Sequence, residues 1–360
     1  MRKKTILLVA LFTLIGSACV SPTAAPLEPT ATSAQAIKAP IVLTVMTHDS
    51  FSISEEVVAA FEAEHNAQLQ FLKAGDTGTA VSKAVLAKDN PLADVFYGID
   101  NTFLSRALEE GIFESYTSPI LAEIPEMFKL DPENRALPVD YGDVCLNYDV
   151  AFLNENAIDP PTSLEDLLDP IYKGLLVVQN PATSSPGLAF LLTTIGHFSE
   201  DDYLNYWRGL VDNDVLVVND WETTYYSEFT RWGGTRPIVV SYGSSPPAEV
   251  YFSEEPLDEA PTAAVVDPET CFRQIEFVGI LKGTQNRTLA EAWVDFMLSP
   301  TFQEDMPLHM FVFPVNPNAG LPDVFIEHAV IPDQPVQLSP ESISNNRETW
   351  IQAWTVTVLR

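Results

Sequence analysis

The sequence predicts an α/β protein whose folded part consists of two lobes. Short apolar, β-branched segments alternate with amphipathic segments from residue 41 onward, which is typical of a largely parallel sheet covered by helices. About 320 residues follow the N-terminal stretch, which is enough chain for two lobes. The sequence has no internal repeat.

In the first third of the chain, apolar runs predict strands at 41–47, 69–72 and 93–97. The capping-box pattern Ser52-x-x-Glu55 predicts a helix whose apolar side carries Val57, Val58, Ala60 and Phe61. Two more helices are predicted, one opened by the turn at 76–79 and one running through Leu104 and Leu108 to Gly111.

The remaining strands are predicted at 139–148, 175–179, 215–218, 238–242 and 273–280, the first of them interrupted by Gly142. The remaining helices are predicted at 164–168, after Gly187, at 289–298, and at the C-terminus around Trp350 and Trp354. Residues 314–340 are expected to be extended and irregular because they are rich in proline.

This order of elements predicts that the chain crosses between the lobes near 140–148 and near 271–277. We therefore expect residues 41–143 and 272–338 to form one lobe, 144–271 the other, and 339–360 a C-terminal helix. Loops after parallel strands line the ligand crevice of such folds, so a ligand site is expected between the lobes.

The N-terminus has the pattern of a secretory signal. Arg2, Lys3 and Lys4 precede an apolar run at 6–15, which is too short to span a bilayer as a helix. The following Gly16-Ser17-Ala18-Cys19 resembles the bacterial lipobox, although Gly16 stands where a leucine is usual. The resemblance implies residues 1–19 as a lipoprotein signal peptide, lipidation of Cys19, and an exported protein on the cell membrane, facing the periplasm or the cell exterior. The alternative is an ordinary signal peptide.

Residues 20–40 are rich in Pro, Thr, Ala and Ser and are predicted to be a flexible linker. The net charge is −31, from 50 acidic and 19 basic residues. This charge argues against a nucleic-acid partner. It suits a cationic ligand, although acidic surfaces also serve solubility alone.

Motifs of catalysis are absent from the sequence: it contains no G-x-S-x-G, no H-E-x-x-H, no Walker loop and no dinucleotide fingerprint. The five histidines are scattered and no cysteine pair has zinc-ligand spacing. We therefore expect a binding protein that has no enzymatic activity, cofactor or metal. The alternative from another class is an anchored hydrolase that uses scattered carboxylates.

Two polar turns, 76–78 and 183–187, each precede a predicted helix. Helix N-termini with hydroxyls suit a phosphate or sulfonate, although simple N-capping also explains these residues. Aromatic residues lie near such turns in the sequence: Trp221, Tyr225, Tyr226, Tyr242 and Phe311. Their rings could hold a flat heterocycle or an organic cation, or could belong to the core.

An ordered set of blocks resembles the thiamine-binding periplasmic proteins. These blocks lie at 43–51, 93–95 with 98–101, 181–188, 239–242 with 245–246, 296–300 and 314–316. The resemblance covers about residues 41–355. It implies a type II periplasmic-binding-protein fold with the ligand cleft between two lobes. It also implies delivery of thiamine or a thiamine phosphate to an ABC permease and its ATPase. We expect the protein to be a monomer.

The resemblance and the polar turns together give a set of expected ligand-binding residues: His48, Asp49, Asp76, Thr77, Asp100, Thr183, Ser184, Ser185, Trp221, Tyr242 and Phe311. Asp49, Asp76 and Asp100 are the candidates for an acidic group near the thiamine cation, or else they stabilise turns. His48, Ala248 and Phe311 depart from the aromatic residues that the family often has. The alternatives within this class are ferric iron, held by Tyr225 and Tyr226, and a polyamine or another organic cation.

Cys145 and Cys271 fall on the two predicted crossing strands, which often run side by side in this fold. Opposed residues on neighbouring antiparallel strands have Cα atoms about 4.5–5.5 Å apart, within reach of a disulfide. We therefore predict a disulfide between them. The alternative is two separate buried thiols.

Overall fold

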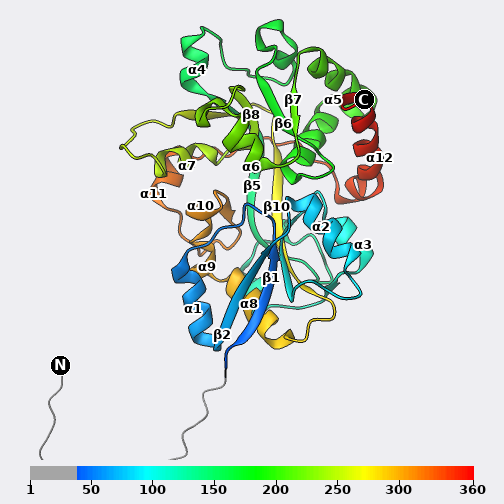
Figure 1. Cartoon of the computed structure of the whole chain (residues 1–360), viewed down its shortest axis with the longest axis vertical. Coiled ribbons are helices and arrows are strands. Elements are labelled where there is room, and N and C mark those ends of the chain that lie inside the picture. The colour runs from blue at the N-terminus through cyan, green and yellow to red at the C-terminus, as the bar shows by residue number, and fades with distance from the viewer. Residues whose placement is uncertain (1–38) are drawn as a thin grey trace, which may run out of the picture. The chain divides into compact units, whose positions relative to one another are not determined.

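Figure 1 shows a computed structural model of the chain, which describes residues 39–360. The predicted signal peptide, Cys19 and the predicted linker up to residue 38 lie outside the described residues. Within 39–360, no helix has the length and apolar character needed to cross a membrane.

The first lobe contains the strands and helices that lie in the lower part of the body in Figure 1. Its elements are β1 (Ile41–Thr47), α1 (Glu55–His65), β2 (Ala67–Lys73), α2 (Thr77–Leu86), β3 (Val95–Asp100), α3 (Leu104–Glu110), β4 (Phe113–Glu114), α8 (Arg287–Leu298), α9 (Pro300–Gln303), α10 (Met306–His309) and β11 (Phe313–Pro314). Short 3-10 turns occur at Pro119–Glu123 and Glu126–Phe128.

The second lobe lies in the upper part of Figure 1. Its elements are α4 (Val150–Glu155), β6 (Leu176–Gln179), α5 (Ser185–Asp212), β7 (Leu216–Val218), α6 (Trp221–Thr223), β8 (Ile238–Tyr242), α7 (Ser245–Tyr251) and β9 (Thr262–Val265). A π turn follows α6 at Thr224–Glu228, and 3-10 turns occur at Glu165–Leu168, Pro170–Tyr172 and Thr230–Trp232.

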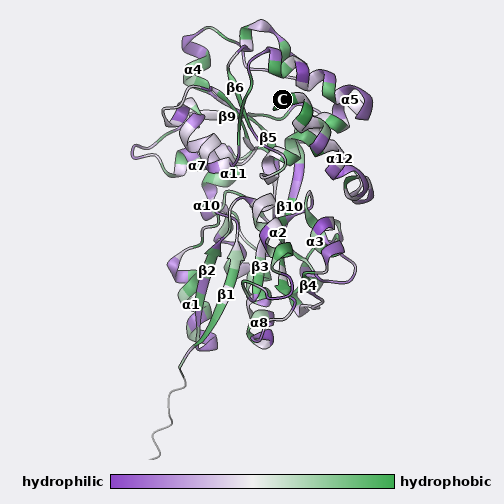
Figure 2. Ribbon diagram, turned by 45° about the vertical axis from the view of Figure 1, so that its right-hand side comes forward, coloured by the Kyte–Doolittle hydropathy of each residue, from purple (hydrophilic) through white to green (hydrophobic). Residues whose placement is uncertain are grey.

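Two long strands, β5 (Leu137–Asp149) and β10 (Phe272–Leu281), run between the lobes. They pair antiparallel at the centre of a sheet with the order β2-β1-β3-β10-β5-β8-β6-β7. The β1–β2, β1–β3, β6–β7 and β6–β8 pairs are parallel. The apolar colouring in Figure 2 concentrates on the strands, and every residue of β3 and β6 is buried.

Gly142 does not interrupt β5, contrary to the sequence prediction. A Cβ atom at this position would lie 2.9 Å from Cδ1 of Tyr242, so the glycine makes room for that ring while the strand continues. The predicted cap of α1 is also wrong. Ser54 rather than Ser52 caps the helix, and its Oγ accepts from the Val57 N–H at 3.3 Å. Val57 and Phe61 are buried, but Ala60 is exposed.

Two further differences concern the C-terminal third. The stretch 314–340 is not wholly irregular, because it contains α11 (Asp323–His328), which packs against α7 of the second lobe. The Val336 N–H also donates to the Cys271 carbonyl at 2.8 Å. Part of the segment 272–338, expected in the first lobe, therefore contacts the second.

The C-terminal helix α12 (Pro340–Val358) contacts both lobes. Trp354 packs edge-on against Trp207 of α5, with ring centroids 5.4 Å apart. On the other side, the Arg347 guanidinium donates to Ser105 Oγ of α3 at 3.0 Å. The helix thus braces the side of the molecule away from α7 and α11 (Figure 1).

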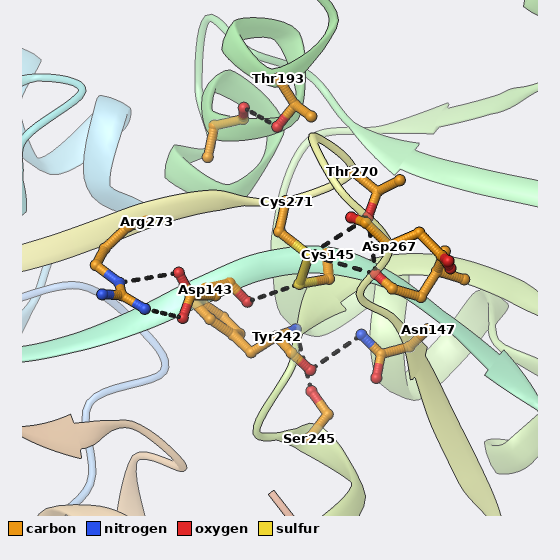
Figure 3. Close-up of a disulfide and its surroundings, with 12 residues drawn as sticks. Asp143, Cys145, Asn147, Thr193, Tyr242, Ser245, Asp267, Thr270, Cys271 and Arg273 are labelled. Carbon is orange, nitrogen blue, oxygen red and sulfur yellow. Dashed lines mark hydrogen bonds and ion pairs between the residues drawn. A yellow bond between two sulfur atoms is a disulfide. The ribbon is translucent and has the colours of Figure 1, made fainter. Parts of the chain in front are cut away.

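A disulfide joins Cys145 of β5 to Cys271, the residue before β10, as Figure 3 shows. The pairing register places these two residues opposite each other, with Cα atoms 4.5 Å apart. Both cysteines are fully buried. The covalent bond therefore links the two crossing strands at the point where they enter the second lobe.

Candidate ligand-binding cavity

A cavity of about 270 Å³ lies between the two lobes, and both lobes contribute to its wall. The first lobe and the crossing strand β10 contribute His48, Ser50, Ser52, Asp76, Thr77, Gln274, Glu276, His309, Met310 and Phe311. The second lobe contributes Ser185, Pro186, Trp221, Glu222, Tyr225, Tyr226, Trp232, Tyr242, Ser245, Ala248, Glu249 and Phe252. Among these residues there is no lysine or arginine.

The start of α2 places Asp76 at the centre of the boundary between the lobes. Its Oδ1 accepts from the Thr77 N–H at 2.7 Å, and its Oδ2 accepts from the Trp221 N–H of the second lobe at 3.1 Å. The start of α2, which the sequence predicts as a possible phosphate site, is therefore capped by the carboxylate of Asp76. Burial raises the pKa of Asp76 above its ordinary value.

The two predicted polar turns come together. A Cβ atom on Gly78 would lie 2.8 Å from the Thr183 carbonyl oxygen, so a larger residue would push the turns apart. The Thr77 hydroxyl is not free to donate to a ligand, because Oγ1 donates to the Gly98 carbonyl at 3.0 Å. Glycine at 78 and the buried Thr77 therefore allow close contact between α2 and the turn before α5.

Aromatic side chains of the second lobe form one wall. The rings of Trp221 and Tyr225 stack with centroids 5.1 Å apart, and Tyr226 and Tyr242 lie edge-on to Trp221. The Trp221 indole donates to Ser241 Oγ at 3.1 Å, which holds the ring in place. Phe311, with a left-handed φ of 56°, packs edge-on against Phe252 at the rim.

Glu249 orients part of this wall. Its carboxylate accepts from the Tyr225 hydroxyl at 2.7 Å, from Arg231 Nε at 2.9 Å and from the Trp232 indole at 3.1 Å. Burial and the neighbouring Glu249 raise the pKa of Tyr225 well above its ordinary value. The tyrosine is therefore a neutral ring that faces the cavity.

The floor of the cavity is acidic. Gln274 and Glu276 of β10 line it, and Gln274 Nε2 donates to both Asp100 Oδ2 and Ser185 Oγ. Burial raises the pKa of Asp100 to about 6 and that of Glu276 to about 7. Burial lowers the pKa of His48, whose Nε2 lies 3.4 Å from Glu276 Oε1.

Seven of the eleven predicted binding residues line the cavity: His48, Asp76, Thr77, Ser185, Trp221, Tyr242 and Phe311. The other four do not. Asp49 accepts from the Gly75 N–H, and Asp100 accepts from Thr102 beneath the floor, so both stabilise turns. Thr183 donates to the Asn219 carbonyl, and Ser184 is fully buried.

Sequence reasoning missed most of the remaining cavity residues. Tyr225 and Tyr226 are recognisable in the sequence as aromatic residues near the turns, but Gln274, Glu276 and Glu249 belong to no motif. Gln274 and Glu276 lie two apart on β10, so they share a face of that strand, which alternation can find once the sheet is known. In residues 39–360, no group of three or more His, Cys, Asp and Glu side chains is arranged to hold a metal ion.

An α/β body with two crossing strands and a polar, aromatic cavity between its lobes defines the class: a two-lobed solute-binding protein. The chain belongs to the bacterial extracellular solute-binding protein family, whose sequence profile matches residues 90–331. It is 30% identical over 324 residues to the thiamine-binding periplasmic protein of Salmonella typhimurium, covering 89% of this chain and 94% of that one. The Escherichia coli thiamine-binding periplasmic protein has the same identity and coverage.

Solved structures agree with the fold class. A periplasmic thiamin binding protein superimposes with a TM-score of 0.80 at 28% identity, over 89% of this chain and 97% of that one. A ferric binding protein from Campylobacter jejuni superimposes with a TM-score of 0.71 at 17% identity, over 88% and 99% of the two chains. At that identity the likeness concerns the fold alone. The type II periplasmic-binding-protein fold expected from the sequence is confirmed.

Proposed function

We propose that this protein is the extracytoplasmic substrate-binding lipoprotein of an ABC importer and that it captures thiamine for delivery to a permease and its ATPase. The observation that carries the proposal is the cavity between the lobes, where stacked aromatic rings stand beside carboxylates and the described lining residues include no lysine or arginine. Thiamine combines a flat aminopyrimidine with a permanently positive thiazolium ring. Both parts suit such a wall, because ring faces and carboxylates attract organic cations.

The names of the relatives support the same ligand, since those of Salmonella typhimurium and Escherichia coli are thiamine-binding proteins. The cavity favours thiamine over its phosphates. Asp76 occupies the start of α2, and no lysine or arginine is among the described residues that line the wall, so none is there to pair with a phosphate. We infer that a phosphate group adds no affinity.

Ferric iron is less well supported. Iron ligation by tyrosine requires the phenolate, but the Tyr225 hydroxyl donates to Glu249, and burial raises the pKa of both Tyr225 and Tyr226. A polyamine would use the carboxylates of the cavity but not its stacked rings. The aromatic wall therefore favours a flat ligand.

Calorimetric titration of the purified protein tests the ligand, using thiamine, its mono- and diphosphate, spermidine and ferric citrate. We expect saturable binding of thiamine, no gain from phosphorylation, and no binding of the other two. Absence of binding to every thiamine form contradicts the proposal. Tighter binding of the phosphates would retain the family function but reject the preference inferred from the cavity.

The mechanism that we propose is closure around the ligand, without chemistry. A ligand that contacts both lobes stabilises the form in which they are close, because it binds that form better. Small-angle scattering should show a smaller radius of gyration at saturating thiamine. Turnover of a phosphorylated thiamine would instead indicate a hydrolase.

A further inference from the structure

Four carboxylates gather beneath and beside the floor of the cavity: Asp76, Asp100, Asp140 and Glu276, here called the acidic cluster. Asp100 and Asp140 are completely buried and Glu276 is 7% exposed. Their elements differ, since Asp76 precedes α2, Asp100 ends β3, Asp140 lies on β5 and Glu276 on β10. The fold thus concentrates negative charge where the two lobes meet.

No lysine or arginine in the described part of the chain forms an ion pair with the acidic cluster; its ion-pair partner there is His48, facing Glu276. Three other buried acidic side chains each have an arginine partner: Asp131 with Arg135, Asp143 with Arg273 and Glu249 with Arg231. Buried carboxylates normally need such a partner or a proton. The buried carboxylates of the acidic cluster therefore lack the positive partner that would stabilise them in the ionised form.

On the crossing strands, the carboxylates of Asp140 and Glu276 have too few hydrogen-bond donors. Asp140 and Glu276 are opposite each other in the β5–β10 register. The Tyr97 hydroxyl has one hydrogen, yet it lies 2.7 Å from Asp140 Oδ2 and 3.2 Å from Glu276 Oε2. Asp140 Oδ1 is buried without a partner in residues 39–360. Two ionised carboxylates in this arrangement repel each other, so an additional proton or a cation is needed.

The groups that face this pair come from every neighbouring element. They are His48 after β1, Tyr97 of β3 and Tyr242 of β8, together with Asp76 and Asp100. Asp49 and the exposed Lys73 at the end of β2 act on His48. The second oxygen of Glu276 lies near His48 Nε2, and both residues line the cavity. Glu276 is thus the buried member of the cluster that reaches the ligand space.

We propose that Glu276 is the residue that selects a positively charged ligand, and that the acidic cluster releases a proton when the cation enters the cavity. This proposal rests on the proposed function, in which the ligand is an organic cation. The positive ring supplies the missing counter-charge, so Glu276 becomes ionised in the complex. A neutral ring of the same shape leaves the proton in place.

The direction of the pH dependence follows from these groups. Burial raises the pKa of Asp100 to about 6 and of Glu276 to about 7, and a nearby cation lowers both. Affinity for the cation therefore increases with pH through this range. His48, whose pKa burial lowers, becomes positive only at lower pH and then opposes the cation, which acts in the same direction.

Calorimetry of the whole protein with thiamine and with deazathiamine, in which a neutral thiophene replaces the thiazolium, tests the proposal. For the unaltered protein, thiamine affinity should increase with pH between about pH 5 and about pH 8, by at most roughly tenfold per unit for each proton released. Titrations in two buffers of different ionisation enthalpy should show that proton release directly. Deazathiamine affinity should show no such rise.

Glu276→Gln should weaken thiamine binding by about tenfold or more, flatten its pH profile and leave deazathiamine binding unchanged. Glu155→Gln, which removes an exposed charge on α4 outside the cavity, is the matched control and should behave as the unaltered protein. The buffer experiment needs no variant, so a misfolded variant would not prevent the test.

Two outcomes overturn the inference while the proposed function stands: pH-independent thiamine binding without proton release, or equal weakening of both ligands by Glu276→Gln. If the unaltered protein binds neither ligand at any pH, the proposed function fails and the inference fails with it. A thiamine-specific loss in Glu276→Gln together with proton release supports both.

Discussion

The Trp221 N–H donates to Asp76 Oδ2 at 3.1 Å, joining two residues that are 145 positions apart and belong to different lobes. The same carboxylate caps α2 through the Thr77 N–H. One side chain therefore completes a helix in the first lobe and holds the aromatic wall of the second. Substitutions at this position should affect both stability and closure.

Asp76→Ala should lower the free energy of unfolding by about 1 kcal/mol, because an N-cap is lost. It should also weaken thiamine binding by roughly tenfold or more, because Trp221 loses its partner in the other lobe. Urea denaturation and calorimetry measure the two effects. Ser339→Ala is a suitable control, since it removes the Ser339 Oγ that caps α12 from the Ser342 N–H. An Asp76 variant with reduced stability but full affinity would show that the bond between lobes is unimportant for binding.

Trp221 should report the ligand optically. Its ring lines the cavity and stacks on Tyr225, so bound thiamine should quench its fluorescence. Trp221→Ala should weaken thiamine binding by about 0.5–2 kcal/mol and remove most of the quenching. Trp354→Phe removes a tryptophan packed between α12 and α5, and should leave the quenching intact. Because Trp232 also lines the cavity, full quenching together with full affinity in Trp221→Ala would show that the ligand does not contact Trp221.

The disulfide should contribute to stability and not to recognition. Cys145 and Cys271 are separated by 126 residues, and loop-closure entropy for a loop of this size corresponds to about 4–5 kcal/mol. The double variant Cys145→Ala, Cys271→Ala should lose up to this amount in urea denaturation and keep its affinity for thiamine.

Thiol titration provides the independent check of this bond. Denatured, unreduced protein should show no reactive thiol from Cys145 or Cys271, and two after reduction. Two thiols before reduction would contradict the disulfide.

Stability without ligand should decrease as pH rises from about 4.5 to about 7. Glu276 has an ordinary pKa of 4.5 and a folded value of about 7, so the folded state binds more protons in this window. The free energy of unfolding therefore falls with increasing pH there. Asp100, with a folded value of about 6, acts in the same direction. His48, whose pKa is lowered by burial, acts in the opposite direction. It is one group against two, Glu276 and Asp100, so the net effect keeps their sign.

Urea denaturation across this range measures the slope, and Glu276→Gln should make it shallower. General repulsion from the net charge of −31 has the same sign as the Glu276 effect. The difference between the variant and the unaltered protein isolates Glu276, and Glu155→Gln controls for the loss of one charge. An identical slope in both variants would mean that Glu276 is not protonated in the folded protein.

The sequence alone determined most of the local elements, because their causes are local. The apolar run at 41–47 is a strand, and Asp76 precedes a helix because its carboxylate caps the Thr77 N–H of the same turn. The family blocks and the polar turns likewise led to the fold and to seven residues of the cavity wall. The two cysteines could be predicted to pair because the predicted crossing strands often run side by side in this fold, and the disulfide is present.

Only the tertiary structure decided which polar side chains reach the ligand space. Asp76 and Asp100 both border a connection from a strand to a helix, yet Asp76 lines the cavity and Asp100 is sealed beneath Gln274. Glu276 lies within an ordinary strand, and nothing local distinguishes it from other strand residues. Its role depends on the register that sets it opposite Asp140 and on the fact that no lysine or arginine within residues 39–360 forms an ion pair with it. Charge balance in a buried site is a sum over elements distant in sequence, so no local pattern can reveal it.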